Sequence, residues 1–148
     1  MAGGALYDLG VYTTEFIQDF TRGKTLKEVK GVVCNNDIGT DMTTSAVFLF
    51  DDGMQANMMC SFTAYADIAT TVYGTNGYVK FDNFQMPKRV ELYVDHVLKD
   101  AFESDFSSGF EYEIRHMANC IANGLLTSPV ITPEDTMACA DVFETILK

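Results

Sequence analysis

Positive charge is scarce in this chain. Its 148 residues include 10 Lys and Arg against 21 Asp and Glu, which gives a net charge of −11 at pH 7. A surface of this sign repels the phosphates of nucleic acids and the anionic headgroups of membranes. We therefore expect neither nucleic acid nor a membrane among its partners.

Long apolar runs and targeting features are lacking too. No apolar stretch approaches the ~20 residues that cross a bilayer, and the first residues do not combine a basic segment with an apolar one. The sequence therefore predicts a cytoplasmic protein. A length of 148 residues with 47% hydrophobic content predicts a single domain, residues 1–148, around one core.

Cysteine is present but not in a disulfide or metal-binding pattern. Cys34, Cys60, Cys120 and Cys139 show no C-x-x-C spacing, so reduced and buried thiols are expected. His116 and Cys120 are four residues apart in a predicted helix and could supply two zinc ligands. No second ligand pair accompanies them, so we expect a buried thiol beside an imidazole and no metal site.

Signature motifs of several enzyme classes are also missing. The chain has no G-x-G-x-x-G turn, P-loop lysine motif, G-x-S-x-G elbow or H-E-x-x-H helix. Gly74-Thr75-Asn76-Gly77 is the nearest approach to a phosphate-binding loop. It lies between two predicted strands, where a hairpin turn explains it better. The chain alone is expected to bind no nucleotide cofactor.

The pattern that is present runs from helix through sheet to helix. Apolar residues at helical spacing predict helices over residues 5–22 and 110–123. Thr132-Pro133-Glu134-Asp135 supplies an N-cap, a proline and two acids, which predicts a last helix ending at Leu147. Strands are predicted over residues 29–35, 42–50, 55–63, 68–73, 78–81 and 89–98. Together they predict an α+β fold, with an open, mainly antiparallel sheet of about six strands and helices on one face.

Two of the predicted strands have a second face with little charge. Residues 43–48 and 56–61 place hydroxyl, methyl and thioether groups opposite their apolar face. A sheet face of this kind suits a partner surface. The alternative is an ordinary exposed face, rich in Thr and Ser because these residues favour strands.

The first helix opens with an acid and a phenol four residues apart. Asp8 and Tyr12 share a helix face, and Gly10 between them reduces side-chain bulk. Gly3-Gly4 lets the chain enter the helix in a conformation that other residues resist. Such a pair could act on one small ligand. Alternatively, Asp8 and Tyr12 are only part of the solvated side of this helix.

These residues carry a resemblance to a known family. Residues 3–12 resemble the GG-x-L-x-D-x-G-x-[HY] segment that opens the C-terminal domain of the glucose-fructose oxidoreductase/inositol dehydrogenase/MocA oxidoreductases. Residues 50–53, 72–79, 109–124 and 129–135 resemble later motifs of the family in the family's order. Tyr12, where many members have a catalytic histidine, is similar to the dihydrodiol dehydrogenase and xylose dehydrogenase branch.

The resemblance implies that the chain is the C-terminal half of a two-domain NAD(P)-dependent oxidoreductase. A Rossmann domain with the nucleotide site and an E-K-P lysine would lie outside these residues. Tyr12 is then the catalytic residue and Asp8 the substrate-binding residue. The reaction would be hydride transfer to or from a sugar, polyol or trans-diol, and this chain alone would be inactive.

The resemblance also implies a homodimer or larger homo-oligomer, formed through the open face of the sheet. A competing hypothesis is a stand-alone, non-catalytic binding or scaffold protein that has kept the same fold.

Overall fold

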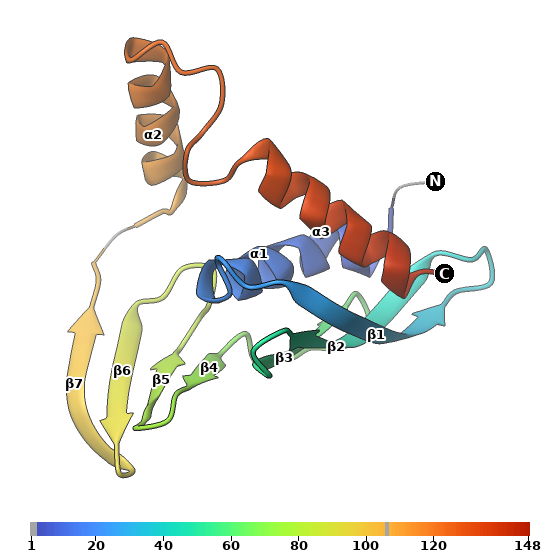
Figure 1. Cartoon of the computed structure of the whole chain (residues 1–148), viewed down its shortest axis with the longest axis horizontal. Helices are drawn as coiled ribbons and strands as arrows, with labels where there is room; N and C mark the ends of the chain where they lie inside the picture. Colours follow the sequence, from blue (N-terminus) through green and yellow to red (C-terminus); the bar gives the residue numbers. More distant parts are fainter. Residues whose placement is uncertain (1–2, 106) are drawn as a thin grey trace. The chain divides into compact units, whose positions relative to one another are not determined.

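The computed structural model describes residues 3–105 and 107–148. The chain divides into two compact units, Met1–Tyr65 with Pro129–Lys148 and Ala66–Ser128. Figure 1 labels the helices and strands of both units. No helix in the described part of the chain has the length and apolar character needed to cross a membrane.

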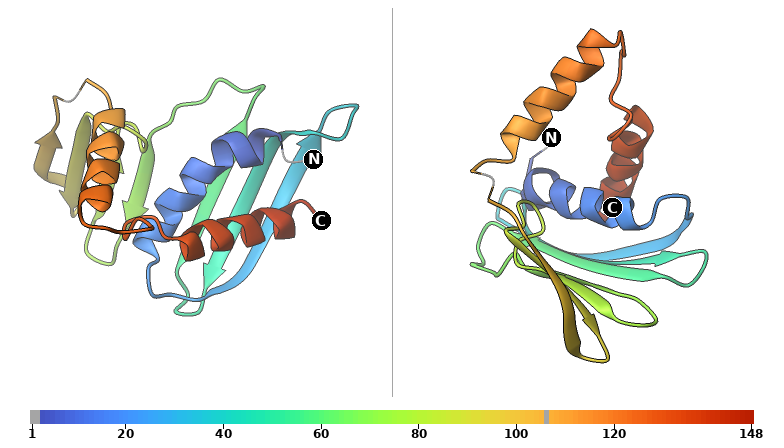
Figure 2. Two further views of the ribbon diagram at one scale, coloured as in Figure 1. Left: turned by 90° about the horizontal axis from the view of Figure 1, so that it is seen from above. Right: turned by 90° about the vertical axis from the view of Figure 1, so that its left-hand side faces the viewer.

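The first unit packs helices on one face of a three-stranded sheet. Its elements are η1 (Leu6–Gly10), α1 (Val11–Phe20), β1 (Leu26–Asn35), β2 (Asp41–Phe50), β3 (Gln55–Ser61) and α3 (Pro133–Ile146). The sheet has the order β1-β2-β3 and both pairings are antiparallel. Figure 2 shows α1 and α3 together on one face of this sheet.

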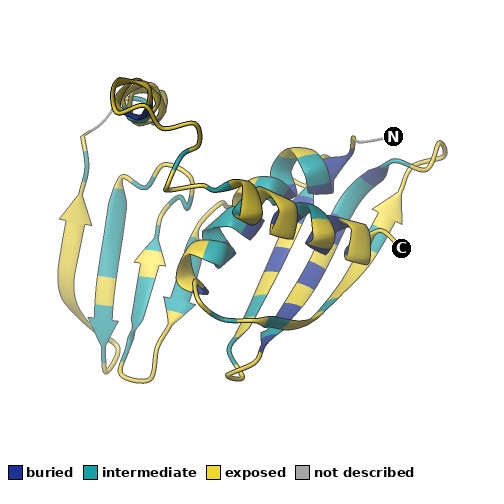
Figure 3. Ribbon diagram, turned by 45° about the horizontal axis from the view of Figure 1, so that its top comes forward, coloured by how far each residue is buried: buried dark blue, intermediate teal, exposed yellow. Residues whose placement is uncertain are grey.

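The core of the first unit lies between that sheet face and the helices. Burial alternates along β2 and β3 (Figure 3), because successive strand residues point to opposite faces. Fully burying one large apolar side chain of such a core contributes about 1.5–3 kcal/mol. The core consists of Ala5, Leu6, Ile17, Ala46, Phe48, Phe50, Met58, Cys60, Cys139, Val142, Phe143 and Ile146.

The second unit contains a four-stranded sheet and one helix. Its strands are β4 (Thr70–Tyr73), β5 (Tyr78–Phe81), β6 (Arg89–Val94) and β7 (Val97–Glu103), antiparallel and in sequence order, and its helix is α2 (Phe110–Ala122). Tyr78 and Tyr93 stack across β5 and β6 with centroids 4.9 Å apart. The apolar stripe of α2, formed by Phe110, Ile114, Met117 and Ile121, is exposed.

The structure confirms the α+β class and the antiparallel pairing, and it corrects the sheet. Within residues 3–105 and 107–148, seven strands form two hydrogen-bonded sheets, whereas about six strands in one sheet were predicted. The prediction of one strand over residues 89–98 was wrong, because the chain turns at Asp95 and His96, whose φ angles are 50° and 61°. Asp enters this left-handed region more readily than most residues, but no glycine marks the turn, and β7 was therefore missed.

The cysteine prediction holds for three of the four residues. Cys60, Cys120 and Cys139 are buried and all four cysteines are free. Cys34 is exposed instead, because it lies on β1 opposite Thr43, on the face of the sheet away from the helices. Burial raises the pKa values of the Cys60 and Cys139 thiols to about 11, which keeps both protonated near neutral pH.

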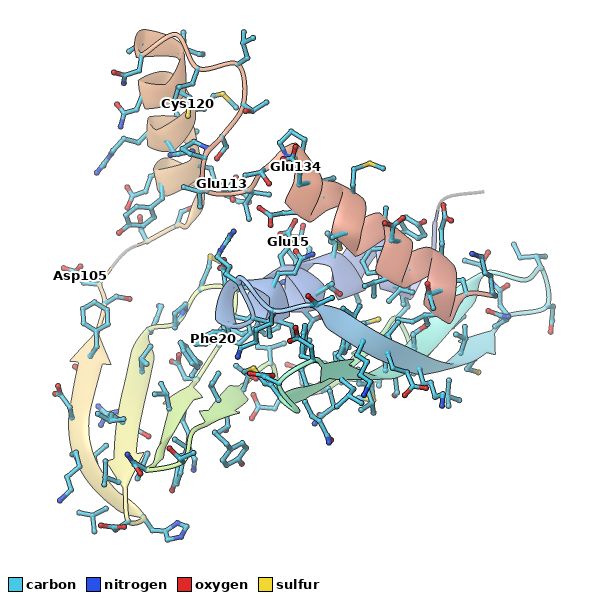
Figure 4. All side chains as sticks on the ribbon, in the orientation of Figure 1. Glu15, Phe20, Asp105, Glu113, Cys120 and Glu134 are labelled. Atoms are coloured by element: carbon cyan, nitrogen blue, oxygen red, sulfur yellow. The ribbon has the colours of Figure 1, made fainter. Side chains whose placement is uncertain are left out.

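The charged form of Glu15 is unfavourable in the folded first unit. It projects from α1 toward α3 (Figure 4), and burial, together with the charges of Asp19 and Asp135, raises its pKa. The folded state therefore holds the proton more tightly than the unfolded state does. Stability contributed by the neutral form is lost as the pH rises through the folded-state pKa.

Glu15→Gln is therefore expected to stabilise the fold near neutral pH. Urea denaturation should show a gain of less than about 1 kcal/mol, since water screens a partly exposed carboxylate. The gain should vanish in acid, below the unfolded pKa, because both states then hold the proton. Glu144→Gln, at an exposed position of α3, is the control. An equal gain from both variants at neutral pH would contradict the assignment to Glu15.

Candidate active site at the start of the first helix

The structure places Asp8 and Tyr12 on the solvent side of one helical turn. Leu6–Gly10 forms a π-helical turn that continues into α1, and such wide turns are frequent at functional sites. Leu6 is fully buried below this turn. Asp8 is exposed and Tyr12 is 50% exposed. Both side chains are thus open to a small molecule.

Gly10 has a different role from the one expected. A Cβ atom at this position would lie 2.8 Å from Leu6 Cδ1 and 3.3 Å from Cys60 Sγ. Gly10 is buried against β3 and does not open space beside Asp8 and Tyr12. Its small size lets the turn approach the sheet closely.

Asp41, the first residue of β2, holds the start of this turn. Its carboxylate is buried, and Oδ2 accepts a hydrogen bond of 2.6 Å from the Leu6 backbone N–H. The Thr44 hydroxyl donates to the same oxygen at 3.4 Å. An acidic side chain at a helix start satisfies a free backbone donor and complements the helix dipole.

Gly4 leaves the space that the Asp41 carboxylate occupies. A Cβ atom on Gly4 would lie 1.7 Å from Asp41 Oδ1, and its φ of 121° is one that L side chains rarely adopt. This contact explains the second glycine of the opening motif. Sequence reasoning missed Asp41, because the contact joins residues 35 positions apart and no local motif marks it.

The pair considered as zinc ligands forms a small polar cluster in the second unit. His116 Nε2 lies 3.5 Å from Cys120 Sγ and 2.8 Å from Ser128 Oγ. Among residues 3–105 and 107–148, no group of three or more His, Cys, Asp and Glu could hold a metal ion. Ser128 provides the imidazole with a hydrogen-bond partner instead.

Gly74-Thr75-Asn76-Gly77 forms the turn between β4 and β5. The Gly74 N–H donates to the Gly77 carbonyl at 2.8 Å, and a strand follows rather than a helix. A pyrophosphate site needs a helix N-terminus whose free N–H groups point at the phosphates. These residues therefore do not fit the pyrophosphate of NAD or NADP.

The comparisons with known proteins agree with this architecture. The model of the GFO/IDH/MocA C-terminal domain family matches residues 1–80. A trans-1,2-dihydrobenzene-1,2-diol dehydrogenase of Sus scrofa is 30% identical over 155 residues, covering 99% of this chain and 46% of that protein. The chain thus spans about half the length of the curated relatives it matches.

Two solved structures have the same fold. An aldose-aldose oxidoreductase from Caulobacter crescentus, complexed with glycerol, matches with a TM-score of 0.80 and 19% identity, over 97% of this chain and 44% of that one. A 3-ketoreductase from Actinomadura kijaniata in complex with NADP has a TM-score of 0.79 and 18% identity, over 98% and 47% of the two chains.

These findings define an α+β domain of the kind found in oxidoreductases. The chain belongs to the GFO/IDH/MocA C-terminal domain family. The resemblance seen in the opening motif is thereby confirmed.

The isolated chain is expected to bind neither NAD(H) nor NADP(H), since its glycine-rich turn joins two strands. Titration calorimetry with each nucleotide should give no heat of binding. The same titration of the 3-ketoreductase from Actinomadura kijaniata, whose structure was solved in complex with NADP, is the positive control. A micromolar dissociation constant for the isolated chain would contradict the prediction.

Proposed function

We propose that this chain is the single C-terminal domain of an NAD(P)-dependent oxidoreductase, and that it binds substrate and forms the oligomer. The reaction is hydride transfer between a nicotinamide and a sugar, polyol or trans-diol. The observation that carries the proposal is the joint exposure of Asp8 and Tyr12 on a turn whose other side is buried. Membership of the family and the names of the relatives support it.

The two side chains have different roles in this proposal. Tyr12 exchanges the proton of the substrate hydroxyl as the hydride moves, with a positive charge beside it to favour the phenolate. That charge comes from a lysine of the nucleotide-binding domain. Asp8 accepts hydrogen bonds from substrate hydroxyls, which an ionised carboxylate does strongly. The nucleotide supplies the hydride chemistry and is held outside this chain.

Tyr12→Phe in the full-length enzyme is expected to lower kcat by about 100- to 10,000-fold, the usual contribution of a general acid or base. Nucleotide affinity should not change. Tyr7→Phe is the matched control, because it also deletes a phenol oxygen from this turn while its ring still packs on Phe143, 5.0 Å away. Wild-type kcat for Tyr12→Phe at all accessible pH values would exclude the proposed role.

Asp8→Asn is expected to act on substrate affinity instead, because it keeps the shape and removes the charge. Steady-state kinetics should show a raised KM for the substrate with a smaller effect on kcat. A loss confined to kcat would assign Asp8 to the chemical step rather than to binding.

We also propose that the chain forms a homo-oligomer through the outer face of the three-stranded sheet. On β2 and β3 this face is uncharged, and Val47 and Met59 are each 53% exposed on it. The Thr43 and Ser61 hydroxyls lie 2.6 Å apart beside them. Uncharged strands with exposed apolar side chains suit a protein interface. The outer residues are Thr43, Ser45, Val47, Leu49, Gln55, Asn57, Met59 and Ser61.

Val47→Lys and Thr44→Lys are expected to affect different properties, the oligomer in the first case and the fold in the second. Val47→Lys should keep the fold and reduce the mass in light scattering, because it places a charge in the interface. Thr44 is 0% exposed on the inner face, so Thr44→Lys should lower Tm or abolish folding. Ile38→Lys, at an 86% exposed position in the turn between β1 and β2, is the control. An unchanged mass for Val47→Lys would reject this interface.

A further inference from the structure

We propose that Asp41 is the positioning residue of the active site: its buried carboxylate fixes the orientation of the turn that presents Asp8 and Tyr12 to the substrate. This role rests on the proposed function of those two residues. Asp41 itself is 3% exposed and lies beneath the turn, so it acts through the backbone rather than on the substrate.

The hydrogen bond from the Leu6 N–H to Asp41 is made at the first residue of the turn. The Leu6 N–H is one of the donors that a helix start leaves without a partner within the helix, and Asp41 Oδ2 accepts from it at 2.6 Å. Leu6 comes two residues before Asp8. Asp41 is the first residue of β2, the central strand of its sheet, so the acceptor is attached to a strand that is paired on both sides.

Close packing removes the freedom that the hydrogen bond alone would leave. A Cβ on Gly4 would collide with the Asp41 carboxylate, and a Cβ on Gly10 would lie 3.4 Å from Met58 Cε and closer still to Leu6 and Cys60. The turn is therefore held at both ends against the sheet. A tilt of the turn would break one of these contacts and move both exposed side chains together.

The carboxylate acceptor is what makes the contact strong. Hydrogen bonds from N–H groups to a carboxylate are shorter and roughly twice as strong as those to a neutral acceptor. Asparagine would keep the shape of Asp41 but would weaken this bond, and the turn would then shift. A misplacement of about 1 Å near the reacting atoms can cost about 100-fold in rate.

Asp41→Asn in the full-length enzyme tests this role against Asp51→Asn. Asp51 follows the other end of β2, and its carboxylate also accepts from a backbone N–H, that of Thr25 at 3.3 Å. Both variants should lose some thermal stability. Only Asp41→Asn should lower kcat, by about 10- to 100-fold, with an unchanged KM for the nucleotide. Amide hydrogen exchange should accelerate at Leu6 in Asp41→Asn, while amides of Val11–Phe20 keep their protection.

The outcomes separate this inference from the function on which it rests. Wild-type kcat for Asp41→Asn, or equal losses of kcat in the Asp41 and Asp51 variants, would overturn the positioning role while Tyr12→Phe still upholds the function. Full turnover of Tyr12→Phe would reject the proposed function and the positioning role together.

If Asp41→Asn does not fold, Thr44→Val tests the positioning role in its place, because this variant deletes the second donor to Asp41 Oδ2. A several-fold loss of kcat then supports the role, and wild-type kcat rejects it.

Discussion

The hydrogen bond between the Asp41 carboxylate and the Leu6 N–H is the contact around which the first unit is organised. Taking a carboxylate out of water costs several kcal/mol unless hydrogen bonds replace the lost solvation. Leu6 and Thr44 supply those bonds, and the absence of a side chain on Gly4 supplies the room. The glycine motif, the first residue of β2 and the exposed acid–phenol pair are therefore parts of one arrangement.

At the opposite end of the first helix a polar network adds to the buried residues Ile17 and Thr21. Arg22 Nη2 donates to Asp19 and to the Val130 carbonyl at 2.8 Å each, while Nη1 reaches Asp135 at 3.4 Å. Asp135 also completes a capping box with Thr132 at the start of α3. Exposed ion pairs of this kind contribute about 0–1 kcal/mol each. These ion pairs therefore add little to what the burial of Ile17 and Thr21 contributes at this end of the helix.

The sequence predicted features whose causes are local. Thr132 and Pro133 mark the start of α3 by their own capping chemistry, and Gly74-Thr75-Asn76-Gly77 mark a hairpin by a composition that is typical of turns. Asp41 and Gly10 could not be interpreted in this way, since their roles depend on residues brought together by the sheet. The turn at Asp95 and His96 was missed for another reason, because its residues are not ones that typically signal a hairpin turn.

The sequence predicted the residues of the candidate site but not the backbone conformation that presents them. Asp8 and Tyr12 could be found from their spacing and from the family motif. The π-helical turn beneath them could not be predicted, because a helix of ordinary pitch explains the same apolar pattern. The exposure of both residues follows from the burial of Leu6 and Gly10, which is a property of packing against β3.

The two units differ in how they are stabilised, and this difference bears on where chemistry can take place. Among the described residues of the second unit, Cys120 is the one that is buried. Its sheet depends on cross-strand pairs such as the Tyr78–Tyr93 stack, with Lys80 Nζ 5.3 Å from the Tyr93 ring centroid. Such pairs contribute about 0.5–1.5 kcal/mol each, so this unit should open more readily than the first.

A proton-transfer residue works best when its position is fixed before the substrate binds. In its proposed role Tyr12 would meet this condition, because it lies on α1, and both α1 and the preceding turn η1 pack against β3 in the unit that holds the core. The less packed second unit provides no comparable support. The proposed acid and phenol thus lie on the unit that has the buried core.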